Sequence, residues 1–342
     1  MRAAVYRQFD GPILIEDVPE PEPSPDGVVI EVRASGLCRS DLHGWHGLDP
    51  DVELPMVPGH ELAGVIDAVG SGVQRWTVGD RVTIPFCCGC GVCGQCRAGN
   101  TQICDDYFQP GFTAWGSFAQ LVAVSAADVN LVALPEDLDY PEAAILGCRF
   151  ITAYRAVVER GRLDEGEWLA VHGCGGLGLS AVMIAAARGA RVVAIDIDDT
   201  TLDLARSLGA EATVNATAEG VPDAVVAITA GGAHVSIDAL GSPRVAADAL
   251  LGLRKLGRHV QVGLLNEGPA PLPMDAVVAR ELEILGSHGM AVGHYGEVLD
   301  LIADLDLSTL ITRRLSLDEL PEALESMRGF SGAGISVVTS FD

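Results

Sequence analysis

The stretch Gly173-Cys-Gly-Gly-Leu-Gly178 decides the fold of the second half of the chain, because the residues on its two sides have different character. An apolar run at residues 168–171 precedes it, as expected for a buried strand, and residues 179–188 have the composition of a helix. Its glycines permit a tight turn and let backbone N–H groups at the helix N-terminus approach a pyrophosphate. The residues predicted to line this loop are Gly173, Gly175, Gly176, Leu177 and Gly178.

The next predicted strand, Arg191–Asp196, ends on an acidic residue 18 positions after Gly178. A carboxylate at this strand end is positioned to accept hydrogen bonds from the 2′- and 3′-hydroxyls of a ribose. Ile197, Asp198 and Asp199 follow, and none of these three is an arginine that would accept a 2′-phosphate. The segment therefore predicts a dinucleotide site that prefers NAD to NADP.

The alternation of strands and helices continues on both sides of this site. Apolar strand-like runs lie at residues 168–171, 191–196, 212–215, 234–238, 258–262 and 282–285. Helical segments lie between them, including residues 179–188, 201–208 and 242–253. Six strands that alternate with helices predict a doubly wound parallel sheet of the Rossmann type, over residues 150–287.

The flanking regions differ from this central one. Residues 1–149 contain short β-branched runs, such as 28–34 and 62–69, with frequent turn signals and few helical segments. They predict a mostly β domain. Residues 288–342 contain predicted helices near 295–303 and 317–327 and a final strand at 334–339.

The composition excludes several classes of protein. The 342 residues carry 47 acidic and 22 basic side chains, a formal charge of −25, which repels nucleic acid and anionic membrane surfaces. No apolar run reaches the ~20 residues of a membrane span, and charges occupy the place of a secretory apolar core. We expect a cytoplasmic protein, whose nine cysteines serve metal binding or catalysis more readily than disulfides.

Four of these cysteines lie in a lobe at about residues 87–105. Cys90, Cys93, Cys96 and Cys104 have the spacing C-x2-C-x2-C-x7-C, which suits a closed tetrahedral zinc site with no open position. An iron–sulfur cluster is the competing interpretation of four thiolates, and the neighbouring Cys87 and Cys88 are alternative ligands. The lobe therefore predicts a structural metal site.

A second ligand set is more dispersed. Cys38, His60 and Cys148 would give a metal three ligands and leave the fourth position open. Spacing alone does not group them, since a lone cysteine is usually a core residue and a lone histidine is usually hydrogen-bonded or exposed.

Several motifs resemble, in the same order, those of the zinc-dependent alcohol dehydrogenases of the medium-chain dehydrogenase/reductase superfamily. They are GLCRSDLHGWHG at 36–47, GHELAG at 59–64, the cysteine lobe, GCRFITAYRAV at 147–157 and the glycine loop. The resemblance covers essentially the whole chain. It implies a GroES-like β-barrel catalytic domain at 1–149, the Rossmann domain at 150–287, and a segment at 288–342 that returns to the catalytic domain. It places the active site in the cleft between the domains.

The resemblance also assigns roles by motif position. Cys38, His60 and Cys148 match the ligands of a catalytic zinc, so the chain would hold two zinc ions together with NAD. The neighbouring residues that match functional positions are Glu61 near the metal, Asp41 as the carboxylate that orients the ligand histidine, Ser40 and His43 as a proton relay through the cofactor ribose, Arg39 on the pyrophosphate, Thr152 near the nicotinamide and Phe86 in the alcohol pocket. Arg149 departs from the small residues common after this cysteine.

The implied activity is hydride transfer between NAD and a primary or secondary alcohol, with the aldehyde or ketone as substrate in reverse. Polyol and threonine dehydrogenases share the barrel and lobe but usually carry a glutamate where Cys148 stands. Quinone reductases of the superfamily lack both ligand sets. A zinc-ribbon module that binds nucleic acid conflicts with the negative charge.

The sequence also predicts self-association. Residues 282–285 form the sixth predicted strand at the edge of the sheet, and an exposed apolar edge strand can pair with its symmetry mate. The DLHGWHG segment resembles tetrameric microbial members of the family. We therefore expect a homotetramer built from such dimers, in preference to a dimer.

Overall fold

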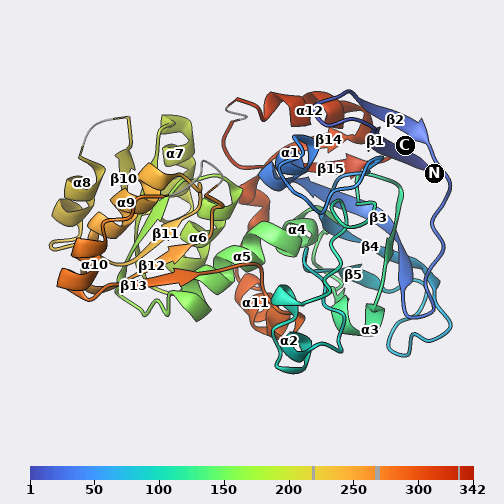
Figure 1. The fold of residues 1–342 in the computed structure, drawn as a ribbon, viewed down its shortest axis with the longest axis horizontal. Helices are drawn as coiled ribbons and strands as arrows, with labels where there is room; N and C mark the ends of the chain where they lie inside the picture. The colour runs from blue at the N-terminus through green and yellow to red at the C-terminus, as the bar shows by residue number, and fades with distance from the viewer. Residues whose placement is uncertain (218–219, 266–269, 330–331) are drawn as a thin grey trace. The chain divides into compact units, whose positions relative to one another are not determined.

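A computed structural model describes residues 1–217, 220–265, 270–329 and 332–342 (Figure 1). The chain forms two compact units. The first contains Met1–Ile151, Gly289–Ser331 and Ile335–Asp342, and the second contains Thr152–His288 and Gly332–Gly334. Among the described residues, no helix has the length and apolar character needed to cross a bilayer.

The second unit is built on a six-stranded sheet with the order β10-β9-β8-β11-β12-β13. The strands are β8 (Trp168–His172), β9 (Arg191–Asp196), β10 (Ala212–Asn215), β11 (Ala233–Asp238), β12 (Leu253–Gln261) and β13 (Glu283–Gly286). Every neighbouring pair is parallel. The predicted doubly wound sheet is confirmed.

Helices connect these strands in two groups. They are α6 (Gly176–Ala187), α7 (Asp199–Ser207), α8 (Val221–Ile228), α9 (Pro243–Leu251) and α10 (Met274–Arg280). Helix α6 packs on α7, and α9 packs on α8 and α10. The strand order runs in opposite directions from β8 and from β11, and right-handed crossovers then place the two groups on opposite faces of the sheet. Ligands of such sheets bind at the carboxyl ends of the strands where the direction changes.

The first unit contains a seven-stranded sheet with the order β14-β15-β3-β4-β5-β7, in which β6 also pairs with β3. The strands are β3 (Val28–Leu37), β4 (Glu61–Val69), β5 (Arg81–Thr83), β6 (Leu121–Val124), β7 (Val132–Ala133), β14 (Ile311–Ser316) and β15 (Ile335–Ser340), and a separate hairpin joins β1 (Arg2–Tyr6) to β2 (Ile13–Asp17). Strand β3 pairs with β4 over residues 28–36, and it is also long enough to pair with β6 through residues 28–31 and with β15 through residues 35–37. The C-terminal strand is therefore part of the first unit.

Helices of this unit are short. They are α1 (Arg39–Trp45), α2 (Gly94–Arg97), α3 (Ala127–Asn130), α4 (Tyr140–Ile145), α11 (Tyr295–Ile302) and α12 (Leu320–Ser326), with 3-10 turns η1 (Thr101–Ile103), η4 (Val292–His294), η5 (Leu307–Leu310) and η6 (Leu317–Glu319). Two π-helical segments flank α5 (Ile151–Tyr154), where the chain passes from the first unit to the second: η2 (Leu146–Phe150) lies in the first unit and η3 (Arg155–Arg160) in the second. π-Helical turns are rare and often lie at functional sites, and the sequence did not predict them.

Candidate active site

The four cysteines of the lobe lie together as a group that could hold a metal ion. Each sulfur of Cys90, Cys93, Cys96 and Cys104 lies within 4.8 Å of the others. Backbone N–H groups donate to three of the sulfurs, for example from Cys96 to Cys93 Sγ at 3.4 Å and from Asp106 to Cys104 Sγ at 3.3 Å. The backbone N–H groups of Cys96 and Asp105 lower the pKa of Cys93 to about 6, which favours the thiolate that a metal binds, whereas burial raises the pKa of Cys96 to about 12.

Cys87 and Cys88 lie outside this group, although they were candidates for it. Cys88 belongs to the core of the first unit, and Cys87 packs beside Cys38 and Cys148. Burial raises the pKa of Cys87 to about 12, so that its thiol is neutral. All nine cysteines are free of disulfide bonds.

Cys38, His60 and Cys148 come together despite their separation in sequence, and Glu61 joins them. One ligand atom from each of these four residues lies within 4.8 Å of the others, and all four residues are buried. Cys38 precedes α1, His60 precedes β4 and Cys148 lies in η2. The Cys148 thiol holds the pKa of Cys38 well below its usual range, against the effect of burial.

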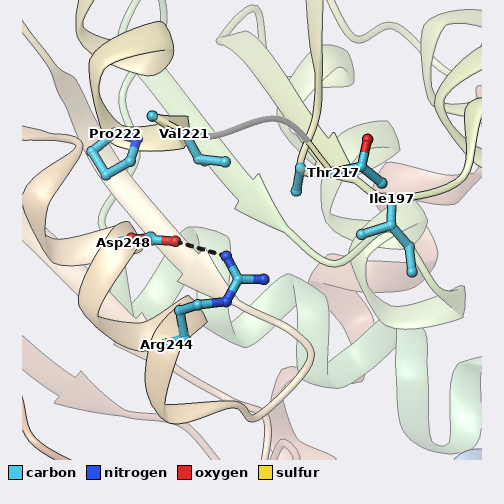
Figure 2. Close-up of a pocket in the computed structure, with 8 residues that line it drawn as sticks. Ile197, Thr217, Val221, Pro222, Arg244 and Asp248 are labelled. Carbon is cyan, nitrogen blue, oxygen red and sulfur yellow. Dashed lines mark ion pairs between the residues drawn. The ribbon is translucent and has the colours of Figure 1, made fainter.

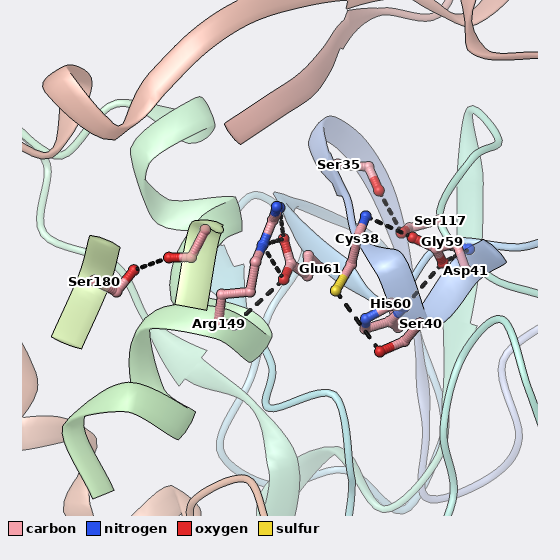
Figure 3. A network of polar contacts seen from close by, with 11 residues as sticks. Ser35, Cys38, Ser40, Asp41, Gly59, His60, Glu61, Ser117, Arg149 and Ser180 are labelled. Carbon is pink, nitrogen blue, oxygen red and sulfur yellow. Dashed lines mark hydrogen bonds and ion pairs between the residues drawn. The ribbon is translucent and has the colours of Figure 1, made fainter. Parts of the chain in front are cut away.

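Asp41 organises two of these ligands (Figure 3). Its Oδ2 accepts a hydrogen bond from the Cys38 backbone N–H at 2.8 Å. Its Oδ1 lies 2.9 Å from His60 Nδ1 and accepts from the Gly59 backbone N–H at 3.1 Å. A proton held on Nδ1 leaves His60 Nε2 as an acceptor, and this buried atom has no hydrogen-bond partner in the structure. The donor set therefore fits a zinc ion.

The predicted proton-relay residues lie on or beside α1. Ser40 Oγ is 3.7 Å from Cys38 Sγ, close to the ligand group. His43 is half-buried one turn further along the helix, and burial together with the charge of Arg39 lowers its pKa. Within the described residues no hydrogen bond connects Ser40 to His43. Arg39 begins α1 and is exposed.

Two aromatic rings lie against His60. Phe86 and Phe112 both meet the imidazole edge-on, with ring centroids at 6.2 and 5.5 Å. Phe86 also packs with Cys38, Cys87 and Cys148. The sequence analysis named Phe86 but missed Phe112, which lies outside every motif that was compared.

Glu61 has a partner that the sequence did not reveal. The Arg149 side chain binds its carboxylate through Nε, at 2.8 Å to Oε1 and 3.1 Å to Oε2, and through Nη2 to Oε2 (Figure 3). The Arg149 backbone N–H adds a bond to Oε1 at 3.3 Å. Burial raises the pKa of Glu61, and the charge of Arg149 opposes this shift. Arg149, which stands where small residues are common, is therefore one partner of a buried ion pair.

The glycine loop of the second unit follows β8 and leads into α6. Gly173 has φ +87°, a conformation that favours glycine, and a Cβ at Gly178 would overlap the Gly173 carbonyl oxygen. A Cβ at Gly175, the N-cap of α6, would meet no atom within 4 Å. Close packing on one side and open space at the helix N-terminus suit a pyrophosphate. Thr152, also in this unit, is buried, and its Oγ1 has no hydrogen-bond partner in the structure.

Asp196 ends β9 beside this loop. Its Oδ2 accepts from the Cys174 N–H at 2.7 Å, and its Oδ1 accepts from the Ile197 and Asp198 N–H groups at 2.7 and 3.2 Å. These bonds fix the carboxylate at the carboxyl end of the strand, as the predicted ribose contact requires.

A hollow of about 520 Å³ lies next to the carboxyl end of β9, and Ile197, which follows Asp196, is one of the residues that line it. It is lined by Ile197, Ala216, Thr217, Gly220, Val221, Pro222, Arg244 and Asp248. Figure 2 shows the Arg244 guanidinium between Asp248 and Ile197, with Arg244 Nη1 3.5 Å from Asp248 Oδ2. The sequence analysis did not name these lining residues apart from Ile197, because they come from separate loops and helices.

Comparisons with known proteins agree over the whole chain. Family models match for an alcohol dehydrogenase GroES-like domain at residues 24–136 and for a zinc-binding dehydrogenase at residues 176–304. An alcohol dehydrogenase of Geobacillus stearothermophilus is 36% identical over 91% of each chain. The solved structure of the alcohol dehydrogenase TADH from Thermus sp. ATN1 has a TM-score of 0.91 and 31% identity, covering 99% of this chain and 100% of that one. A putative zinc-binding dehydrogenase of Sinorhizobium meliloti 1021, solved bound to NADP, has a TM-score of 0.89 and 29% identity, covering 99% and 98%.

Proposed function

The chain belongs to the zinc-dependent alcohol dehydrogenases of the medium-chain dehydrogenase/reductase superfamily, and we propose how its residues carry out that chemistry. The enzyme transfers a hydride between a nicotinamide cofactor and a primary or secondary alcohol, with the carbonyl compound as substrate in reverse. Bound zinc supplies Lewis-acid stabilisation of the alcohol oxygen, and the nicotinamide accepts the hydride.

Cys38, His60 and Cys148 would hold the catalytic zinc. The observation that carries this assignment is His60 Nε2, a buried atom without a partner whose ring is oriented by Asp41. Three protein ligands leave the fourth position to the alcohol. Phe86 and Phe112 present apolar edges beside the histidine, which favours an alcohol with an apolar substituent.

The remaining predicted residues would handle the proton. Ser40 Oγ lies near Cys38, where it can accept the hydroxyl proton of a bound alcohol. His43, one turn further along α1, would receive that proton and release it to solvent. The lowered pKa of His43 keeps its imidazole neutral, and hence able to accept a proton, at pH 7.

NAD would bind along the carboxyl ends of β8 and β9. The pyrophosphate would lie over Gly175 and the N-terminus of α6, and the adenosine ribose would meet Asp196. The hollow beyond Ile197 is large enough for an adenine ring. Arg244 could attract a 2′-phosphate, but Asp248 already pairs with it and Asp196 repels such a phosphate, so NAD is preferred.

A second zinc would be structural. The Cys90, Cys93, Cys96 and Cys104 group uses all four tetrahedral positions for protein ligands, and closed sites of this kind stabilise a fold rather than bind substrate. The zinc-binding family favours zinc over an iron–sulfur cluster here.

We also propose a homotetramer in the cytoplasm. Strand β13 lies at the edge of the parallel sheet, and Ile284 within it is 40% exposed. Pairing between two β13 strands would continue the sheet across a two-fold axis. Light scattering tests this assembly: a mass near the 35.7 kDa of one chain would refute the shared sheet, and a stable dimer would refute only the tetramer.

A panel of alcohols assayed with NAD and with NADP tests the proposed activity. We expect oxidation of simple alcohols with apolar substituents, and faster turnover with NAD. Cys148 stands where polyol dehydrogenases usually carry a glutamate, so polyols should be poorer substrates. No turnover of any simple alcohol, combined with turnover of polyols, would reassign the enzyme to the alternative class.

A further inference from the structure

Arg149 and Glu61 form a buried ion pair directly beside the three-ligand group. Glu61 follows the ligand His60, and Arg149 follows the ligand Cys148, so each partner is bonded to a ligand residue. The Glu61 side chain is fully buried, and that of Arg149 is 9% exposed. The pair therefore lies within the site and not on its surface.

The carboxylate is close enough to act as a ligand itself. A Glu61 oxygen lies within 4.8 Å of the ligand atoms of Cys38, His60 and Cys148. Carboxylate oxygens are among the protein ligands that bind zinc. A Glu61 that took the fourth position would exclude the alcohol from it.

Arg149 engages both oxygens of this carboxylate. Its Nε contacts Oε1 and Oε2, its Nη2 contacts Oε2, and its backbone N–H reaches Oε1. Charge-assisted bonds that bind a carboxylate side-on are strong and fix its orientation. Glu61 must give up some of these contacts before an oxygen can turn toward a metal.

The surrounding backbone holds the pair in place. Gly36 of β3 pairs with Glu61 of β4, and a Cβ at Gly36 would overlap Glu61 Oε2 and lie 2.9 Å from Arg149 Nη2. The glycine thus makes room for the pair. The π-helical turn η2 carries both Cys148 and Arg149 into the site.

The positive charge of Arg149 also compensates the negative charge of Glu61. Two thiolates neutralise the charge of a zinc ion, so an unpaired Glu61 would leave an extra negative charge in a buried site. A buried charge without its partner is strongly unfavourable, and ligation of the cation would relieve it. Removing Arg149 therefore both frees Glu61 and drives it toward the metal.

We propose that Arg149 is a positioning residue that binds Glu61 side-on and thereby keeps the fourth coordination position of the catalytic metal open for the alcohol. This inference rests on the proposed function, because it requires a metal on Cys38, His60 and Cys148. It explains the arginine at a position where the family commonly has a small residue.

Cobalt(II) substitution tests the proposal without relying on activity. The absorption bands of cobalt report its coordination number, and subtraction of the spectrum of Cys38→Ser protein isolates the three-ligand site from the four-cysteine site. In Arg149→Met we expect the bands to shift, as for a four-coordinate ion whose fourth ligand has changed from water to a carboxylate oxygen, and added alcohol should no longer perturb them. We also expect zinc release to a chelator to slow, because Glu61 adds a protein ligand, and the KM for alcohol to rise.

The double variant Glu61→Gln with Arg149→Met is the matched control. It removes both charges, so its cobalt spectrum and zinc release should return toward those of the wild type. An unchanged spectrum in Arg149→Met, or an altered spectrum that persists in the double variant, would overturn the proposal. If Arg149→Met does not fold, Arg149→Gln carries a weaker form of the test: its amide can keep one bond to Glu61 but supplies no charge, so we expect a smaller spectral change in the same direction, and no change would overturn the proposal.

Different results would refute the three-ligand metal site and the positioning role of Arg149. Wild-type protein with no cobalt bands beyond those of Cys38→Ser would refute the three-ligand metal site, and with it the proposed function. Bands that are present in the wild type but do not respond to Arg149 and Glu61 would refute the positioning role alone.

Discussion

The two groups of candidate metal ligands in the first unit are built in opposite ways. The four-cysteine group draws its ligands from fifteen consecutive residues, three of them only partly buried, and backbone N–H groups are the donors to its sulfurs. The three-ligand group joins segments far apart in sequence and is buried. The Asp41 side chain bonds to two of its residues, and the ion pair of Glu61 and Arg149 lies beside it.

This difference suits the four-cysteine group to stabilising the fold and the three-ligand group to taking part in the reaction. A closed set of thiolates needs only a local loop to fold around an ion. A reactive site needs an open position, and it needs side chains that fix the ligands and set their charge. Variants at the two groups should therefore affect different properties of the enzyme.

Cys38→Ser should cause the largest change. Loss of a thiolate ligand weakens the catalytic metal, and the Lewis-acid effect is worth several kcal/mol, so kcat should fall by about a thousandfold or more. The melting temperature and NAD binding, measured by calorimetry, should remain close to those of the wild type. Wild-type activity in a variant that has lost one zinc would contradict the assignment of this group.

Cys96→Ser should have the reverse profile. Closed zinc sites contribute folding free energy, and a loss of several kcal/mol lowers the melting temperature by roughly 10 °C in a domain of this size. Turnover per folded molecule at low temperature should change little. A variant of full thermal stability that is nevertheless inactive would exchange the roles of the two groups.

The contrast also shows what the sequence could and could not predict. The Rossmann sheet followed from periodicity, and the four-cysteine group followed from spacing, because both signals are local. Cys38, His60 and Cys148 required a family resemblance, since the contacts that unite them are made only after folding.

Arg149 is an example of a residue whose role could not be predicted from local sequence signals. Its partner Glu61 is 88 residues away in the sequence, so nothing near Arg149 indicates an ion pair. The π-helical turn that carries it leaves no periodicity signal. Arg244 was missed for the same reason, because the hollow that it lines is assembled from several loops.

Asp196→Ala probes the second unit, whose described residues include no candidate metal-binding group. Loss of a charged hydrogen-bond acceptor should raise the KM for NAD by about 10- to 100-fold and weaken discrimination against NADP. Ile197→Arg in addition should favour NADP further. Steady-state kinetics with both cofactors provide the measurement, and an unchanged preference in the double variant would show that another residue reads the ribose.

His43→Ala should have the smallest effect, because His43 acts at a distance from the reacting atoms. Its pKa is lowered by burial and by Arg39, so wild-type turnover should decline only below the usual histidine range, where the protonated ring can no longer accept a proton. In the variant, kcat at pH 7 should fall by about tenfold, less than the loss of a direct acid or base causes. Rescue by imidazole buffer checks the role, and an unaltered pH profile would remove His43 from the relay.

The division of labour between the two metal groups is tested most directly by zinc content measured together with activity and melting temperature. We predict two zinc ions per chain in the wild type and one in each of Cys38→Ser and Cys96→Ser, with activity lost in the first variant and thermal stability lost in the second. A wild-type protein with one zinc per chain, or two variants that lose activity and stability alike, would contradict the account.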